Sequence, residues 1–310
     1  MTDFSNEILS SWQVRKTKKQ KTAFIQRMQQ QFPQLRIESS GFPQSRNLIL
    51  GDLDTAQVVY TAHYDTCAQL PFPNFITPKN MWLYLGYQLL LVVPFLALMF
   101  LVNWGLKALS VHPVVSIWAA YLIMMIAVFF VFMGGPANKH TANDNTSGVT
   151  VLVDTMLAMP PELRDQVTYV FFDLEEAGLF GSASYRAKHK KETKRQLLIN
   201  FDCVSDGDHL LLVLRKGAHR FADTLAEAFP AEDGKLQREI CRRGVFYPSD
   251  QSNFPCGVGV AALKKSRKLH ILYMNRIHTR RDTVYEAENI SYLKNGCIRL
   301  AALLSEQENI

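Results

Sequence analysis

The chain has 310 residues, of which 48% are hydrophobic and 20% are charged, and its formal net charge is +6 at pH 7. This composition is that of an ordinary globular protein, and the length predicts one large α/β domain or two small ones with a sizeable core. The basic runs lack the interleaved aromatic residues that stack on bases, so we expect no nucleic-acid partner. Five scattered cysteines without a CxxC pair argue against a disulfide scaffold and favour a reducing compartment.

The N-terminal region is polar and basic over its first 30 residues, and it contains no apolar segment that resembles a signal peptide. Residues 15–21 carry five positive charges in seven residues. We interpret the other basic runs as solvated faces. This first run is also suited to rest on anionic lipid headgroups.

Two strands are expected in the first third of the chain, at residues 47–50 and 57–62. The first of them ends at Gly51-Asp52, a pair typical of turns. His63, Tyr64 and Asp65 follow the second strand directly. The sequence therefore places chemically reactive side chains at the end of a strand.

The most apolar part of the chain consists of residues 81–102 and 113–133, which are 22 and 21 residues without a charge. Because a bilayer core needs about 20 apolar residues per helix, each segment is long enough to cross a membrane. Residues 103–112 connect them, so residues 78–138 are predicted to form an inserted transmembrane hairpin. Residues 1–77 and 139–310 then form a single discontinuous domain. Pro94 is expected to kink the first helix, which membrane spans tolerate.

The orientation of the hairpin follows from the basic residues near its ends. Lys79 and Lys139 flank the outer ends, whereas the tip offers only Lys107. This asymmetry predicts a cell-membrane protein with two spans and a cytoplasmic catalytic domain. Two alternatives stay open: a buried soluble hairpin, and an apolar arm used for dimerisation, which would make the protein a homo-oligomer.

The remaining elements alternate between helices and strands. Helices are expected at residues 149–159, 177–189, 221–229 and 290–306, and strands at residues 166–172, 197–201, 210–214, 258–263 and 269–273. This alternation predicts an α/β fold with a mixed, mostly parallel central sheet covered by helices on both faces. In such a sheet, chemistry is expected at the carboxyl ends of the strands.

Acidic residues and histidine follow three of the expected strands. His63 and Asp65 follow residues 57–62, Glu175 and Glu176 follow residues 166–172, and Asp202 follows residues 197–201. Asp144 lies just before a helix, where an N-cap is the simpler interpretation. Four carboxylates that share one cleft would repel each other and raise each other's pKa, however, so the pattern favours bound cations.

Six separated segments now carry a resemblance to a known family. They are His-x-Asp at residues 63–65, Asn-Asp-Asn-Thr-Ser-Gly at 143–148, Asp-x-Glu-Glu-x-Gly-Leu-x-Gly-Ser at 173–182, Asn-Phe-Asp at 200–202, Ser-Asp-x-x-x-Phe at 249–254 and His-x-x-x-Asp-Thr at 278–283. In this order they resemble the M28 family of co-catalytic zinc aminopeptidases. The resemblance covers nearly everything outside residues 78–138 and implies a zinc-exopeptidase-like fold.

The resemblance implies a site with two Zn²⁺ ions per chain. Asp144 would bridge them, His63 and Asp202 would complete the shell of one ion, and Glu176 and His278 that of the other. Glu175 would be the general base. Asp65, which also belongs to the catalytic centre, would fix the tautomer of a ligating imidazole, and Asp282 would do the same. The contacts on the substrate side would come from Ser249, Asp250, Gln251 and Phe254, although Gln251 stands where many relatives have histidine.

The charges agree with this assignment. Two Zn²⁺ balance a hydroxide and the carboxylates of Asp144, Glu176 and Asp202, which leaves Glu175 free to hold a proton. Because zinc lowers the pKa of bound water to about 7, a nearby carboxylate can remove its proton at neutral pH. We expect a membrane-tethered aminopeptidase that hydrolyses the N-terminal residue from peptides with a free N-terminus.

Two other classes of function stay open. Related glutaminyl cyclases use one zinc ion to cyclise an N-terminal glutamine without hydrolysis. In this chain, the retention of His63 and Asp202 allows a second ion. The other alternative is a catalytically silent membrane receptor or scaffold with the same fold. The presence of Glu175 and of all five expected ligands argues against it.

Overall fold

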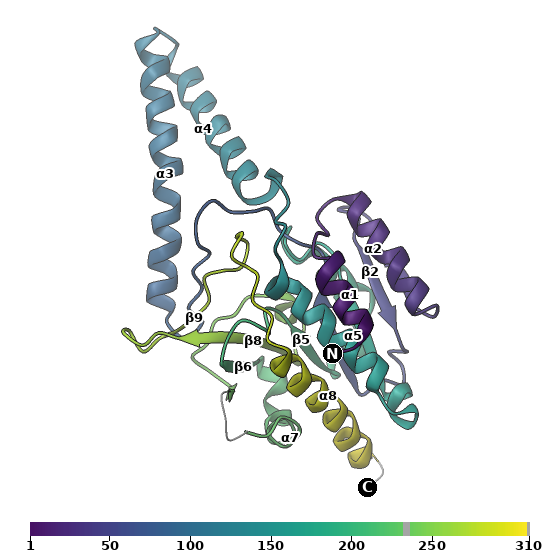
Figure 1. Ribbon diagram of the computed structural model, residues 1–310. Coiled ribbons are helices and arrows are strands. Elements are labelled where there is room, and N and C mark those ends of the chain that lie inside the picture. Colours follow the sequence, from purple (N-terminus) through teal and green to yellow (C-terminus); the bar gives the residue numbers. More distant parts are fainter. Residues whose placement is uncertain (232–235, 309–310) are drawn as a thin grey trace.

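A mixed β-sheet forms the centre of the domain in the computed structural model, which describes residues 1–231 and 236–308 (Figure 1). Among these residues, the sheet has the strand order β1-β2-β4-β3-β5-β8-β6-β7, and β9 pairs with β8. The strands are β1 (Arg36–Ser39), β2 (Arg46–Leu50), β3 (Val58–His63), β4 (Val167–Phe172), β5 (Leu197–Phe201), β6 (His209–Leu214), β7 (Gln237–Cys241), β8 (Gly257–Lys265) and β9 (Leu272–Tyr273).

The four central strands, β4, β3, β5 and β8, run parallel. The register pairs His63 of β3 with Phe172 of β4, and Thr61 of β3 with Asn200 of β5. The carboxyl ends of these strands therefore meet at one edge of the sheet. On both sides of this centre, β2 and β6 pair antiparallel with their neighbours β4 and β8.

Helices cover both faces of the sheet. Consecutive residues of a strand point to opposite faces, so a strand that is apolar throughout needs packing partners on each face. Val58 and Tyr60 of β3 pack in one core cluster with the helices α1 (Asp3–Ser11), α2 (Lys18–Gln31), α5 (Gly148–Ala158), α7 (Ala222–Ala228) and α8 (Ala287–Glu308). Val59 packs on the opposite face with Tyr185 of α6 (Phe180–Lys188). The predicted fold class is confirmed.

Several elements were not anticipated from the sequence. The helices α1 and α2 lie in the polar N-terminal region, where only a few apolar side chains, such as Ile8 and Phe24, reach the core. The strands β1 and β7 are mostly exposed or half-buried, so they lack an apolar signature. The strand expected at residues 269–273 is reduced to β9, and the helix expected from residue 177 begins at Phe180.

The basic run at residues 15–21 is not a solvated face throughout. The side chain of Arg15 is fully buried, and the ammonium group of Lys21 lies 2.5 Å from the buried carboxylate of Asp173. These two residues cannot rest on lipid headgroups, because the folded domain encloses them. For Arg15 and Lys21 the expectation from charge density was therefore wrong.

The apolar segments form two long helices that project away from the domain (Figure 1). They are α3 (Met81–Ala108) and α4 (Pro113–Phe129), and a π-helical turn at Phe130–Gly134 follows α4. The first helix continues past residue 102 and contains Pro94. No residue of α3 is buried, so the alternative of a buried soluble hairpin is wrong. α3 is long and apolar enough to cross a membrane, and so is α4 together with the π-helical turn that follows it.

The two helices of the hairpin contact each other through small and polar residues. Ser116 and Ala120 are the buried residues of α4. The Ser116 hydroxyl lies 2.9 Å from the backbone carbonyl oxygen of Asn103 and 2.7 Å from the Asn103 side-chain oxygen. Small residues and hydrogen bonds of this kind are typical of helix pairs in membranes.

Candidate active site

Asp144 lies in an irregular turn that leads into α5. This turn comprises Ala142–Ser147, and the peptide bond between Asp144 and Asn145 is cis. Gly148 begins the helix at a point where a Cβ atom would lie 2.3 Å from the Phe201 carbonyl oxygen. The glycine thus allows α5 to approach the end of β5 closely, which brings Asp144 to the carboxyl edge of the sheet.

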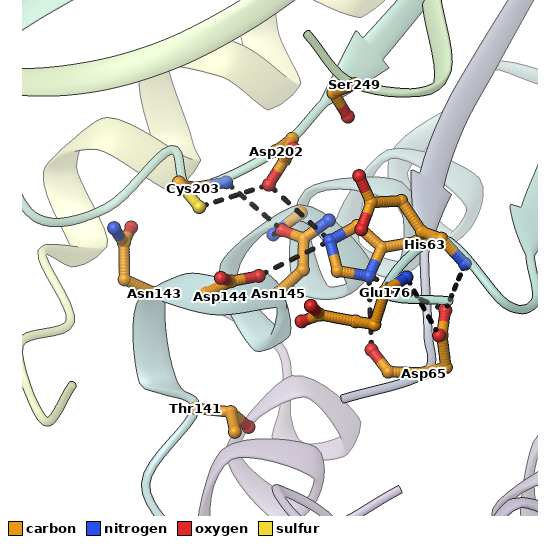
Figure 2. Close-up of polar contacts among 12 residues, drawn as sticks. His63, Asp65, Thr141, Asn143, Asp144, Asn145, Glu176, Asp202, Cys203 and Ser249 are labelled. Atoms are coloured by element: carbon orange, nitrogen blue, oxygen red, sulfur yellow. Dashed lines mark hydrogen bonds and ion pairs between the residues drawn. The ribbon is translucent and has the colours of Figure 1, made fainter. Parts of the chain in front are cut away.

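The two oxygens of Asp144 face two different histidines. Its Oδ1 atom lies 3.4 Å from Nε2 of His63, and its Oδ2 atom lies 2.9 Å from Nε2 of His278. Asp202 Oδ1 lies 3.5 Å from the same nitrogen of His63, whereas Glu176 Oε2 lies 3.3 Å from that of His278. Figure 2 shows His63, Asp144 and Asp202 turned toward one another. Two groups of potential ligands therefore share one carboxylate.

The five side chains make a donor set that suits zinc. Ligand atoms of His63, Asp144 and Glu176 all lie within 4.8 Å of one another. Imidazole nitrogen and carboxylate oxygen are common zinc ligands. Glu176 Oε1 is buried and has no hydrogen-bond partner in the described part of the chain. An unpaired buried carboxylate oxygen is costly, and a cation would satisfy it.

The side chains of the site shift each other's pKa strongly. Although burial acts to raise it, His278 and His63 hold the pKa of Asp144 well below its usual range. Burial raises the pKa of Glu176 to about 8. Burial opposes the charge on His278, but Glu176 and Asp144 outweigh it and raise the pKa of His278 to about 9. Any metal that binds here must displace the protons that these groups hold.

Glu175 lies on the side of the site where His63 and Asp202 meet. A carboxylate oxygen of Glu175 and ligand atoms of these two residues lie within 4.8 Å of one another. Burial, followed by the acidic neighbours Asp202 and Glu176, raises the pKa of Glu175 well above its usual range, despite the opposing effect of His63. A carboxylate with a raised pKa is suited to accept and return a proton near neutral pH.

Asp65 and Asp282 hold the backbone of the loops that carry the candidate ligands. The carboxylate of Asp65 accepts hydrogen bonds from the backbone N–H groups of Glu175 and Glu176, at 3.1 and 3.2 Å (Figure 2). The carboxylate of Asp282 accepts those of Asn143 and Asp144, at 2.8 and 2.9 Å. Each carboxylate thus fixes two consecutive peptide groups.

Asp65 and Asp282 were expected to fix the tautomers of the imidazole rings through their carboxylates, and the structure shows other contacts. Nδ1 of His63 lies 3.1 Å from the backbone carbonyl oxygen of Asp65 and 3.7 Å from its carboxylate. The carbonyl group of Asp65 is therefore the closer orienting partner of this ring. The carboxylate of Asp282 is occupied by the peptide groups before Asp144.

The residues expected on the substrate side lie below the surface of the site. The buried residues of this group are Ser249, Asp250, Gln251 and Phe254. The Asn200 side chain donates hydrogen bonds to Ser249 Oγ and Gln251 Oε1, at 3.0 and 3.1 Å. The Phe254 ring stacks on Phe172. These contacts connect the segment at residues 249–254 to β4 and β5, and none of the four residues lines the pocket at the candidate ligands.

The pocket at the five candidate ligands has a volume of about 130 Å³. Besides the candidate ligands, Glu175 and Cys203, the residues that line the pocket are Asn74, Ile76, Tyr84, Tyr247, Pro248 and Ile277. The sequence motifs gave no signal for these six residues. Tyr84 in particular lies in the segment that was interpreted purely as a membrane span.

The N-terminal segment passes directly behind the site. Arg15 Nε donates a hydrogen bond to the backbone carbonyl of Tyr64, at 2.6 Å, and Arg15 Nη1 donates one to Thr146 Oγ1, at 3.2 Å. Gln13 Oε1 accepts a hydrogen bond from the backbone N–H of Thr141, at 2.8 Å. The sequence pattern carries no signal for these residues, because a buried arginine within a basic run looks the same in sequence as a solvated arginine.

Comparison with known proteins agrees with this architecture. The sequence model of peptidase family M28 matches residues 127–301, which include Asp144, Glu175, Glu176, Asp202 and His278. His63 and Asp65 precede the matched segment and reach the site through β3. No curated protein matches the chain.

Solved structures share the fold over almost the whole chain. The LapA aminopeptidase of Legionella pneumophila is 12% identical, with a TM-score of 0.54, and the match covers 97% of this chain and 68% of that one. Glutaminyl cyclase of Porphyromonas gingivalis is 14% identical, with a TM-score of 0.59, covering 98% and 96%. LapB of Legionella pneumophila is 13% identical, with a TM-score of 0.54, covering 97% and 70%. Because the sequence model of the family matches more than half of its length, the chain belongs to peptidase family M28.

Proposed function

We propose that this chain is a dizinc aminopeptidase held at a membrane by its helical hairpin. The arrangement of Asp144 carries the proposal, because its two oxygens face two separate ligand groups. Asp144, His63 and Asp202 would hold one ion, and Asp144, Glu176 and His278 the other. A single ion would leave one of these groups without a partner for its buried charges.

The residues of the chain divide the chemical work. When bound, zinc ions lower the pKa of water to about 7 and polarise a carbonyl oxygen. Glu175 accepts the proton that the attacking water loses and returns it to the nitrogen of the leaving amine. Asp65 keeps Glu175 and Glu176 in place through their peptide N–H groups. The small size of the pocket suits the end of a peptide better than an internal segment.

A glutaminyl cyclase is the second candidate. The structure of the Porphyromonas gingivalis glutaminyl cyclase matches over 96% of its own length, so the two folds have a similar extent. A cyclase with one zinc ion would use Asp144, Glu176 and His278 and leave His63 and Asp202 without a metal. The close approach of His63 to both Asp144 and Asp202 favours the peptidase.

The membrane attachment is part of the same proposal. Exposed apolar side chains extend along both helices of the hairpin, including Leu89 at 69% and Leu122 at 60% exposure. Lipid would cover this surface in a spanning hairpin. Lys79 and Lys139 lie at the base of the hairpin, whereas Lys107 alone lies near its tip, and this asymmetry supports the proposal of a cytoplasmic catalytic domain.

One set of measurements tests this function. Protein purified in detergent and loaded with zinc is offered peptides with a free N-terminus, the same peptides with an acetylated N-terminus, and peptides that begin with glutamine. We expect two zinc ions per chain and release of a free amino acid only from unblocked peptides. Pyroglutamate formation with one zinc ion per chain would establish the cyclase, and no turnover at full metal load would establish a silent scaffold.

A further inference from the structure

The first turn of the hairpin is part of the pocket at the proposed metal site. Tyr84 of α3 lines this pocket together with Asn74 and Ile76, which lead into the helix. Figure 1 shows that α3 rises from the part of the domain where β8 and β9 lie. A segment inserted between two ligand-bearing loops thus supplies one wall of the site.

Contacts on both sides hold this wall in position. The backbone groups of Ile76 and Met274 exchange two hydrogen bonds, at 2.9 and 3.0 Å. The Pro78 carbonyl accepts a hydrogen bond from the backbone N–H of Phe246, at 2.8 Å. The ring of Tyr84 lies 5.8 Å from that of Phe246. Because Tyr247 follows Phe246 and also lines the pocket, Tyr84 is fixed relative to the opposite wall.

The chemistry of the walls restricts what can enter. Apart from the ligands, Glu175 and Cys203, the lining consists of Ile76, Tyr84, Tyr247, Pro248, Ile277 and the amide of Asn74. None of these six side chains carries a charge at neutral pH, so none offers an ion pair to a charged N-terminal side chain. The volume is about 130 Å³, whereas pockets for drug-sized ligands hold about 300–1,000 Å³. Metal ions and water have to share this space, which leaves room for a compact apolar side chain.

The position of Tyr84 along α3 explains why it can serve both the pocket and the membrane anchor. Trp104 lies twenty positions after Tyr84 and is 73% exposed near the hairpin tip. At about 1.5 Å per residue, they lie about 30 Å apart, which is about the thickness of the hydrocarbon core. Tyrosine and tryptophan favour the two membrane interfaces. The turn that carries Tyr84 can therefore stay at the domain while the rest of α3 crosses the bilayer.

We infer that Tyr84 is a specificity-determining residue, and that its ring limits the enzyme to peptides whose N-terminal side chain is compact and apolar. This inference rests on the proposed aminopeptidase function. The ring closes the pocket wall from the hairpin side, so a large N-terminal side chain collides with it. Removal of the ring opens the pocket toward the base of the hairpin.

The test compares variants of the full chain in detergent at equal zinc content. Peptides that differ only in an N-terminal Ala, Leu, Phe, Lys or Glu are assayed for kcat/KM with the wild type, Tyr84→Ala, Tyr84→Leu and Tyr84→Phe. Trp82→Ala is the matched control, because Trp82 lies in the same turn, is 83% exposed and does not line the pocket. A second arm measures the binding of alanine hydroxamate and phenylalanine hydroxamate, which needs no turnover.

We expect the wild type to prefer Ala over Phe by at least about tenfold, and Tyr84→Ala to remove this preference by a similar factor. Tyr84→Phe and Trp82→Ala should keep this preference, and Tyr84→Leu, which preserves the helix, should show an intermediate preference.

If peptides are hydrolysed but no Tyr84 variant changes the order of substrates, the inference is overturned and the proposed function stands. If no peptide is hydrolysed but Tyr84→Ala reverses the order of hydroxamate binding, the proposed function fails and the pocket assignment stands. If the Tyr84 variants keep the wild-type order of both peptide substrates and hydroxamates, the inference is refuted.

Discussion

The buried guanidinium of Arg15 donates a 2.6 Å hydrogen bond to the backbone carbonyl of Tyr64, the residue between His63 and Asp65. The same guanidinium reaches Thr146, two residues after Asp144. Arg15 therefore joins the two loops that present His63 and Asp144 to the site. Burial lowers the pKa of Arg15 to about 10, so the group stays charged at neutral pH beside Asp65 and Asp144.

Replacement of Arg15 by alanine should destabilise the domain and weaken metal binding. The change removes hydrogen bonds from a charged donor to buried acceptors, so we expect a loss on the order of 3 kcal/mol in the free energy of unfolding. Urea unfolding at fixed zinc, together with zinc titration of chelator-treated protein, measures both effects. The control is Lys19→Ala in the same basic run, because Lys19 is exposed and its loss should change little. Equal stability of the two variants would show that Arg15 does not join the loops.

Replacement of Glu175 by glutamine should separate metal binding from catalysis. Glutamine cannot accept the proton from water, so we expect kcat to fall by about 10²–10⁴-fold at unchanged zinc content. Steady-state kinetics and metal analysis of the same sample provide the check. Glu162→Gln is a suitable control, because Glu162 is exposed and precedes β4, whereas Glu175 follows the opposite end of that strand. Full turnover by Glu175→Gln would remove this residue from its proposed role.

Replacement of Asp144 by alanine should release both ions, whereas replacement of Asp202 by asparagine should release one. Asp144 faces both histidines, and Asp202 faces only His63. Zinc content per chain after dialysis distinguishes the two variants, and the melting temperature of Asp144→Ala should no longer rise with added zinc. Two tightly bound ions in Asp144→Ala would refute the shared ligand.

The stability of chelator-treated protein should fall as the pH rises from about 6 to 9. Folding raises the pKa of His278 from 6.5 to about 9 and that of Glu176 from 4.5 to about 8, so both groups bind protons more tightly in the folded state. Their contribution is complete below the unfolded pKa values and is lost as the pH passes the folded ones. Zinc-loaded protein should behave in the opposite way, because metal binding releases these protons. Thermal melts across this range test the prediction, and His278→Gln should flatten the dependence in the absence of zinc.

The tip of the hairpin and the domain should lie on opposite sides of a membrane. The five native cysteines are buried, so a cysteine introduced at the surface can be labelled selectively. In intact cells, we expect an impermeant thiol reagent to label Lys107→Cys at the exposed tip but not Lys19→Cys on the domain, and both in lysed cells. Labelling of Lys19→Cys from outside would reverse the proposed orientation, and labelling of both would exclude a spanning hairpin.

Local patterns in the sequence were sufficient for the sheet and for the main candidates of the site. Apolar runs such as residues 166–172 and 197–201 correspond closely to β4 and β5, because a strand buried on both faces has a continuous apolar signature. The carboxyl ends of these parallel strands meet, so Glu175, Asp202 and His63 could be placed together before their distances were known. The same reasoning could not find β1 or β7, whose side chains are largely exposed.

The sequence by itself determined the candidate ligands, the strands that carry them, and two helices that are apolar enough for a membrane, because these properties depend on residues that lie next to each other along the chain. Only the tertiary structure decided that Arg15 is buried behind the site, that Asp65 and Asp282 hold peptide groups, and that Tyr84 forms a wall of the pocket. Arginine in a basic run and tyrosine in an apolar helix look the same in sequence whether they face solvent, lipid or a site. Their environment is set by contacts with distant segments, and these contacts exist only once the chain has folded.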